Sequence, residues 1–156
     1  MSEAKRPGGL TALAVFNFVF GALGLLGALG LAVFIPMLGQ MPAEATAQMT
    51  PEQLEQINAL KDMGAGLFVT IALLNLVSAL LLILSGIGYL KLKKFLGRTL
   101  GNAYGILGVL ATLGSMLWMP AALGGGSFSI GTIIGLIYPV LTLALINTAF
   151  KEDFVN

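Results

Sequence analysis

The chain has 156 residues and a formal net charge of +1, and hydrophobic residues make up 57% of it while charged residues make up only 10%. Because soluble domains are typically about 25% charged, this composition excludes an ordinary soluble enzyme and indicates an integral membrane protein. With no His and no Cys, the sequence also excludes zinc thiolate sites, iron–sulfur clusters, disulfides and thiol catalysis.

The first uncharged interval of the sequence lies between Arg6 and Glu44. A membrane-spanning helix needs about 20 apolar residues, so this interval predicts one span, which we place at Leu10–Leu38. Residues 39–63 then form a loop outside the membrane.

Within this loop the sequence predicts a short amphipathic helix at residues 51–62. Thr50 offers a capping hydroxyl, Pro51 suits the first helical position, and Gln53 completes a capping box. An apolar face then recurs at helical spacing: Leu54, Ile57 and Leu60. We expect this face to cap the bundle, and the alternatives are that it lies on the bilayer surface or meets a partner.

The next uncharged interval ends at Lys91 and predicts a second span at Gly64–Leu90, followed by a basic loop at residues 91–98. The interval after it, from Thr99 to Phe150, is too long for one span. A proline and a run of glycines at residues 120–127 divide it.

This division predicts a third span at Thr99–Met119, an external Gly-rich loop at 120–127, and a fourth span at Phe128–Phe150 before a tail at 151–156. The predicted fold is therefore an all-α polytopic membrane four-helix bundle, with a single domain that covers residues 1–156.

The charges are distributed unevenly between the two predicted sides of the membrane. One side has a single basic residue, Lys61, together with the acidic residues Glu44, Glu52, Glu55 and Asp62. The other basic residues share the side of the termini: Lys5, Arg6, Lys91, Lys93, Lys94, Arg98 and Lys151. This bias predicts that both termini are cytoplasmic, in a cell membrane such as the bacterial inner membrane.

The basic loop also predicts contacts with membrane lipids. Lys91, Lys93, Lys94 and Arg98 lie where anionic headgroups would attract them. The alternative is that these charges act only as a topology signal.

The first and third predicted spans resemble each other weakly at an offset of 84 residues. Seven identities and two aromatic pairs fall within residues 20–36. The matched pairs are Phe20 with Tyr104, Gly21 with Gly105, Leu23 with Leu107, Gly24 with Gly108, Leu26 with Leu110, Leu29 with Leu113, Gly30 with Gly114, Phe34 with Trp118 and Pro36 with Pro120. Because both spans run in the same direction, this pattern predicts a parallel two-plus-two repeat.

Small residues at spacings of three and four form a helix-packing face on each of these two spans. Such faces let helix backbones approach closely in a membrane, either within the chain or against another protomer or a partner. The predicted residues are Gly21, Gly24, Ala28, Gly101, Gly105, Gly108, Thr112 and Ser115.

Each predicted span carries one Asn: Asn17, Asn75, Asn102 and Asn147. An unpaired amide is costly in lipid, so we expect these side chains to face other helices or a partner. Interhelical hydrogen bonding is the expected role, and a polar vestibule for a small solute is the alternative.

The predicted spans contain no Asp, Glu, Lys or Arg. Intramembrane ionisable residues are typical of proton relays and ion-coupled transporters, and general acid–base catalysis needs a group that titrates. We therefore expect neither an enzyme nor a bound cofactor or metal, and no binding to nucleic acid.

Two hypotheses of function follow from the sequence. The first is a non-enzymatic membrane interaction protein, which acts as an accessory subunit or a self-assembling scaffold through its Gly-rich faces; its partners would be a second copy or another membrane protein. The alternative is an uncoupled channel or carrier for a small neutral or lipophilic solute.

Overall fold

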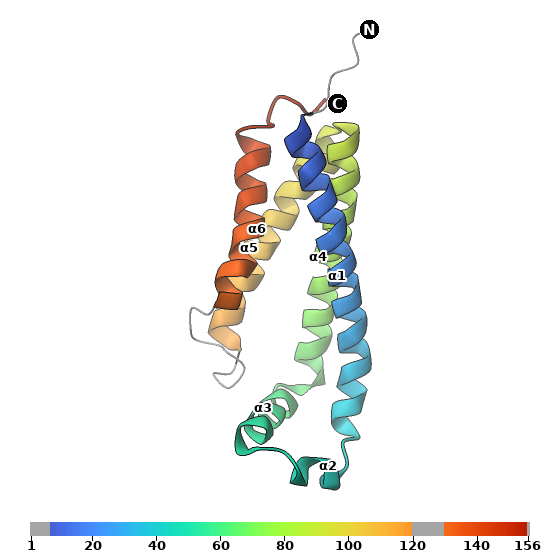
Figure 1. The fold of residues 1–156 in the computed structure, drawn as a ribbon, viewed down its shortest axis with the longest axis vertical. Coiled ribbons are helices and arrows are strands. Elements are labelled where there is room, and N and C mark those ends of the chain that lie inside the picture. Colours follow the sequence, from blue (N-terminus) through green and yellow to red (C-terminus); the bar gives the residue numbers. More distant parts are fainter. Residues whose placement is uncertain (1–6, 120–129, 156) are drawn as a thin grey trace.

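The computed structural model describes residues 7–119 and 130–155, and over these residues it is helical, without a β-strand. The elements in chain order are α1 (Gly8–Gly39), α2 (Ala43–Ala47), α3 (Pro51–Asp62), α4 (Gly64–Lys91), the π-helical turn η1 (Lys94–Thr99), α5 (Leu100–Trp118) and α6 (Ile130–Asn147) (Figure 1). The predicted Gly-rich loop, the predicted start of the fourth span at Phe128, and the basic residues Lys5 and Arg6 lie outside the described residues.

Three segments are long and apolar enough to cross a membrane: α1, α4, and η1 together with α5. Their ends lie within one or two residues of the first three predicted spans, except that the predicted basic loop is largely the turn η1. The helix α6 is apolar but has only 18 residues, and it ends at Asn147 rather than at Phe150. Three candidate spans are therefore established, and a fourth stays a prediction.

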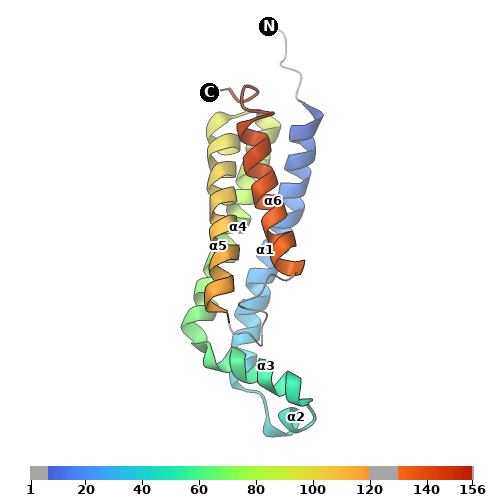
Figure 2. The ribbon, with the colours of Figure 1, turned by 90° about the vertical axis from the view of Figure 1, so that its left-hand side faces the viewer.

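The long helices are arranged as two pairs, in which α1 runs beside α4 and α5 runs beside α6 (Figures 1 and 2). Large apolar side chains point outward from both pairs; Leu26 is 65% exposed and Ile134 is 64% exposed. Such side chains are expected where a helix faces lipid rather than water.

One end of the bundle, which we call the basic end, carries the start of α1, the described tail up to Val155 and the segment from Lys91 to Arg98 (Figure 1). All the long helices but α5, together with the C-terminal tail, contribute to a buried apolar cluster there: Leu10, Leu13, Ala14, Tyr89, Ile146 and Phe154. The tail folds back so that the backbone N–H of Val155 donates to the carbonyl of Leu92 at 2.8 Å. Leu92 has a φ of 54°, which turns the chain after α4 and presents that carbonyl to the tail.

The opposite end, which we call the loop end, carries α2 and α3. The predicted capping box of α3 is confirmed, because Thr50 accepts from the backbone of Gln53 at 3.3 Å and its own N–H donates to the Gln53 side chain at 2.9 Å. The chain then bends at Gly64, whose φ of 74° suits glycine. Only the C-terminal part of α3 reaches α1 and α4, and α3 has no buried residue. The sequence did not predict the short helix α2.

Candidate functional site

The predicted small-residue face of α1 packs against α4. A Cβ at Gly21 would lie 2.7 Å from a side-chain carbon of Ile83, and one at Gly24 would lie 3.1 Å from the Cβ of Ala79. Ala28, in the same row, is 8% exposed. These positions therefore serve contacts within the chain, where glycine allows the two backbones to approach.

The corresponding face of α5 packs mainly against α6. A Cβ at Gly105 would overlap the side chain of Leu143, and one at Gly108 would lie 2.8 Å from Pro139. A Cβ at Gly101 would overlap the Tyr89 hydroxyl, which belongs to α4. Further along α5, Thr112 and Ser115 donate their hydroxyls to backbone carbonyls of their own helix.

These contacts reveal a correspondence between the two pairs. Gly21 and Gly24 contact Ile83 and Ala79, which are four residues apart on α4. The matched Gly105 and Gly108 contact Leu143 and Pro139, which are four residues apart on α6. Corresponding positions of α4 and α6 therefore differ by 60 in residue number, so that Ala79 corresponds to Pro139. The correspondence lies in the contacts between the helices, and the repeat itself stays a prediction.

The four Asn residues have different surroundings. Asn17 is fully buried, and its amide donates to the Ser85 hydroxyl of α4 at 2.7 Å. The Tyr138 hydroxyl of α6 donates to the Asn17 side-chain oxygen. Asn17 therefore joins three helices near the basic end. Two neighbouring hydroxyls in this region, those of Tyr89 and Thr142, are buried without a hydrogen-bond partner among the described residues.

Asn102 and Asn147 form a second polar contact, between α5 and α6. The Asn147 amide donates to the Asn102 oxygen at 2.5 Å and to the Leu143 carbonyl at 2.9 Å. The Arg98 guanidinium donates to the Asn147 oxygen at 3.4 Å, so this half-buried side chain is directed into the bundle. The other predicted headgroup residues, Lys91, Lys93 and Lys94, are exposed.

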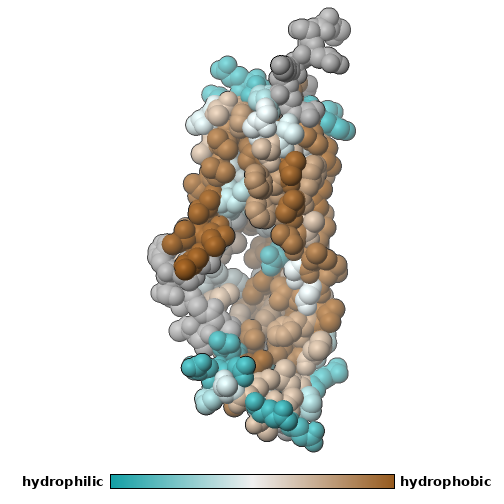
Figure 3. All heavy atoms as spheres, in the orientation of Figure 1, coloured by the Kyte–Doolittle hydropathy of each residue, from teal (hydrophilic) through white to brown (hydrophobic). Residues whose placement is uncertain are grey.

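Asn75 differs from the other three because it bonds only to its own helix. Its amide donates to the Ile71 carbonyl at 3.0 Å. The side chain is exposed, and it borders an open cavity of about 300 Å³ between the two helix pairs, together with Ser78 on the same face of α4. No described residue forms a hydrogen bond with the Ser78 hydroxyl. Figure 3 shows the surface hollowed near the middle of the molecule, with hydrophobic residues around the hollow.

Aromatic rings line the part of this cavity nearest the basic end. The ring centroids of Phe20 and Tyr138 are 4.6 Å apart, and those of Tyr104 and Tyr138 are 6.1 Å apart. Tyr138 has two roles, because its ring lines the cavity while its hydroxyl bonds to the buried Asn17. The cavity is thus separated from the basic end by packed rings and by the polar contacts behind them.

The cavity walls come from corresponding positions of the two pairs. Phe20 matches Tyr104 at the offset of 84, and Asn75 and Ser78 match Gly135 and Tyr138 at the offset of 60; all six line the cavity. The cavity therefore lies between the two helix pairs. Its polar groups are unequally divided, since the position on α6 that corresponds to Asn75 is the glycine Gly135.

A second, smaller cavity of about 130 Å³ continues from Asn75 and Ser78 towards the loop end. It lies between α4 and α5 and is bordered by Ser115, Trp118 and Met119. Trp118 is the only tryptophan of the chain. Neither cavity has a charged residue in its lining.

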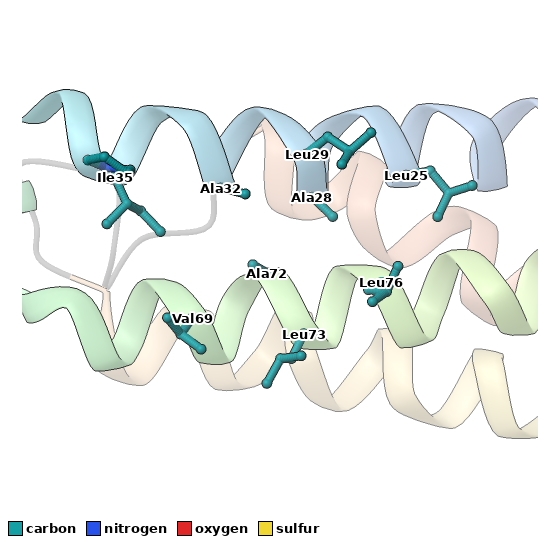
Figure 4. A pocket seen from close by; sticks show the side chains of 10 residues that line it. Leu25, Ala28, Leu29, Ala32, Ile35, Val69, Ala72, Leu73 and Leu76 are labelled. Carbon is teal, nitrogen blue, oxygen red and sulfur yellow. The ribbon is translucent and has the colours of Figure 1, made fainter.

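A third hollow is an apolar groove of about 610 Å³ between α1 and α4. Figure 4 shows the two helices side by side along it, with the small Ala32 and Ala72 near its middle. Only apolar residues line the groove. It can therefore hold a hydrocarbon chain or the face of another helix, but it has no side chain that could bind a polar group.

The sequence indicated Asn75 but not the rings that face it. Tyr104 and Phe20 appeared only as a matched pair in the repeat, and Tyr138 was not singled out. A tyrosine within an apolar segment is a usable signal, because its hydroxyl needs a partner there. Among the described residues, no group of His, Cys, Asp and Glu could hold a metal ion.

Comparison with known proteins adds no assignment. No protein-family model, no curated protein and no solved structure matches this chain.

Proposed function

We propose that this chain is a four-span, non-enzymatic membrane protein that binds a neutral lipophilic molecule between its helix pairs, as an uncoupled carrier or channel. The observation that carries this proposal is the cavity of about 300 Å³ at Asn75 and Ser78. The helix α6 would be the fourth span, and the charge distribution favours a cytoplasmic basic end.

The lining residues support a neutral occupant. A charge placed in this cavity would have no Asp, Glu, Lys or Arg beside it as a counter-charge, and its burial without one is costly. Asn75 and Ser78 can form hydrogen bonds with a single polar group, and the remaining surface suits hydrocarbon. Ion-coupled transport and proton transfer have no side chain in this cavity to support them.

The direct test is whether a neutral lipid is retained when the protein is extracted in nanodiscs and examined by native mass spectrometry. We expect one molecule per chain in the wild type and none in Ser78→Phe, whose ring would fill the cavity. Val77→Phe is the matched control, because Val77 is 46% exposed on the outer face of the same helix. Equal retention by both variants would contradict the proposal.

Transport is tested separately in liposomes. If the protein is a carrier, the flux of a neutral solute should fall in Asn75→Leu, which keeps the shape of the side chain and removes its polar atoms. Retention of a lipid without flux would restrict the function to binding.

The second candidate is an accessory subunit or self-assembling scaffold, and the apolar groove between α1 and α4 favours it. This groove, rather than the glycines that already pack within the chain, would receive the partner. Since the chain has no Cys, a single Ala72→Cys variant can be cross-linked at one position in the membrane. Adducts of defined mass support this candidate, and their absence with an intact fold opposes it.

A further inference from the structure

The residues around the cavity at Asn75 and Ser78 indicate the chemical class of its ligand, and this inference rests on the proposed function. Asn75 lies 11 residues from the start of α4 at Gly64 and 16 from its end at Lys91, so it is well inside the helix from both sides. A phospholipid headgroup placed there would carry its charges into the middle of an apolar segment. A ligand whose polar head is neutral avoids this cost.

The polar groups of the cavity define what the head must offer. Asn75 uses its amide nitrogen for the Ile71 carbonyl, which leaves a second N–H and the side-chain oxygen. The Ser78 hydroxyl lies one turn further along α4. Two donors on one wall favour a head with carbonyl or hydroxyl oxygens, because each would otherwise remain unpaired inside an apolar cavity.

The aromatic wall defines the shape of the head. Phe20, Tyr104 and Tyr138 present rings to the cavity with Tyr138 between the other two. Aromatic rings prefer offset or edge-to-face contacts with other rings, so a planar unsaturated head complements this wall better than an alkyl chain does.

The position of the second cavity defines a path for a tail. It continues from Asn75 and Ser78 along α4 and α5 to Trp118. Apart from Asn75, Ser78 and Ser115, its lining is apolar or aromatic, and it leads from the head site towards the loop end. A hydrocarbon tail on the head would lie there and leave between the helix pairs.

We propose that the cavity binds the head of a lipid-soluble quinone or quinol, a neutral planar ring with oxygen substituents, and that its alkyl tail runs along α4 and α5 past Trp118. Asn75 and Ser78 hydrogen-bond the ring oxygens, and Tyr138 contacts the ring. The protein holds this molecule without reacting with it, since no Asp, Glu, Lys or Arg lines the cavity.

The test uses 2-decyl-1,4-benzoquinone as the probe, with the purified protein in nanodiscs and the single Trp118 as the reporter. Quinone bound beside Trp118 should quench its fluorescence saturably. Decylbenzene, which has the ring and tail but no oxygen, and dodecan-1-ol, which has no ring, serve as competitors. We expect each to displace the probe at least about tenfold less effectively than the corresponding quinol, 2-decylhydroquinone, because of the lost hydrogen bonds.

The variants identify the contacts. Asn75→Leu and Ser78→Ala should each raise the Kd of the probe about tenfold and leave the affinity of decylbenzene unchanged, whereas Val77→Ala should change neither. Ser78→Ala removes a single oxygen atom. It therefore tests the hydrogen bonding even if Asn75→Leu fails to fold.

The outcomes separate the inference from the proposed function. If decylbenzene competes as well as quinol, and Ser78→Phe abolishes both, the lipophilic site stands and the quinone assignment is wrong. If saturable quenching is absent and no lipid is retained in native mass spectrometry, both are wrong. If dodecan-1-ol competes best, the ligand is an alcohol and the planar-head inference is overturned.

Discussion

The basic end and the loop end of this bundle are built in opposite ways. At the basic end, residues of α1, α4, α6 and the tail are buried together, and hydrogen bonds join helices that are far apart in sequence. Towards the loop end, α5 has no buried residue after Gly105, and the buried residues of α4 skip from Ala79 to Phe68. The comparison teaches that close packing at the basic end is enough to hold the two helix pairs together. Space can then remain between the pairs towards the loop end.

Tyr138 lies at the boundary between these two regions. Its hydroxyl belongs to the closed region through Asn17, and its ring belongs to the cavity. Substitutions on the two sides of this residue should therefore differ in kind: those towards the basic end should affect stability, and those in the cavity should affect binding.

The largest effect is expected where backbones touch at the basic end. A Cβ at Gly88 would overlap the backbone of Gly97, and backbone cannot move aside as a side chain can. We expect Gly88→Ala to lower the free energy of unfolding by about 3 kcal/mol, measured by SDS titration in detergent micelles. Gly30→Ala is the control, since no atom lies within 4 Å of its Cβ position. Equal stability of the two variants would contradict the closed packing.

A smaller loss is expected when the polar contact at Asn17 is removed. Asn17→Leu leaves the Ser85 and Tyr138 hydroxyls without this partner in a buried place, so we expect a loss of about 1–2 kcal/mol in the same titration. The double variant Asn17→Leu with Ser85→Ala should lose less than the sum of the single variants, since both changes act on one hydrogen bond. Additive losses would indicate that the two side chains do not interact.

At the loop end, the capping box of α3 should matter only locally. Thr50→Ala removes the acceptor for the Gln53 N–H, and we expect about 1 kcal/mol of local helix stability to be lost. Hydrogen exchange should increase in residues 51–62, while α1 and α4 stay protected because α3 touches them only near its C-terminal end. Faster exchange in α4 would show that α3 supports the bundle.

The smallest effect on stability is expected at Asn75, which makes the strongest contrast with Asn17. Asn75→Leu should change the free energy of unfolding by less than about 0.5 kcal/mol, because this amide bonds only to its own helix. The same variant should lose ligand affinity. A large loss of stability instead would make Asn75 part of the packing and would remove the basis for the cavity proposal.

The sequence predicted the elements of this fold more completely than their arrangement. Uncharged intervals located the long helices, and the Thr50–Gln53 pattern located α3, because both signals are local. The spacing of small residues indicated the packing face of α1, but it could not show that the partner of this face is α4, since the long helices are apolar all round. The separation of the pairs, and hence the cavity beside Asn75, depends on contacts between distant helices that no single segment encodes.

Arg98 shows the same limit on a smaller scale. Its position among lysines predicted contact with headgroups, which stays a prediction, and it gave no sign that the guanidinium donates to Asn147, a residue 49 positions away. The π-helical turn from Lys94 to Thr99 precedes α5 at this point, and a basic sequence does not distinguish such a turn from a loop.

The unequal lengths of the helices have a consequence for the surrounding lipid. At 1.5 Å per residue, α1 with its 32 residues is about 48 Å long, whereas α6 with its 18 residues is about 27 Å long. Hydrocarbon of about 30 Å matches α6 but leaves α1 in excess, and lipid beside a long helix must thicken unless the helix tilts. If α6 also spans the membrane, the difference in length would place a step in bilayer thickness around the protein, with the thicker bilayer beside the α1–α4 pair.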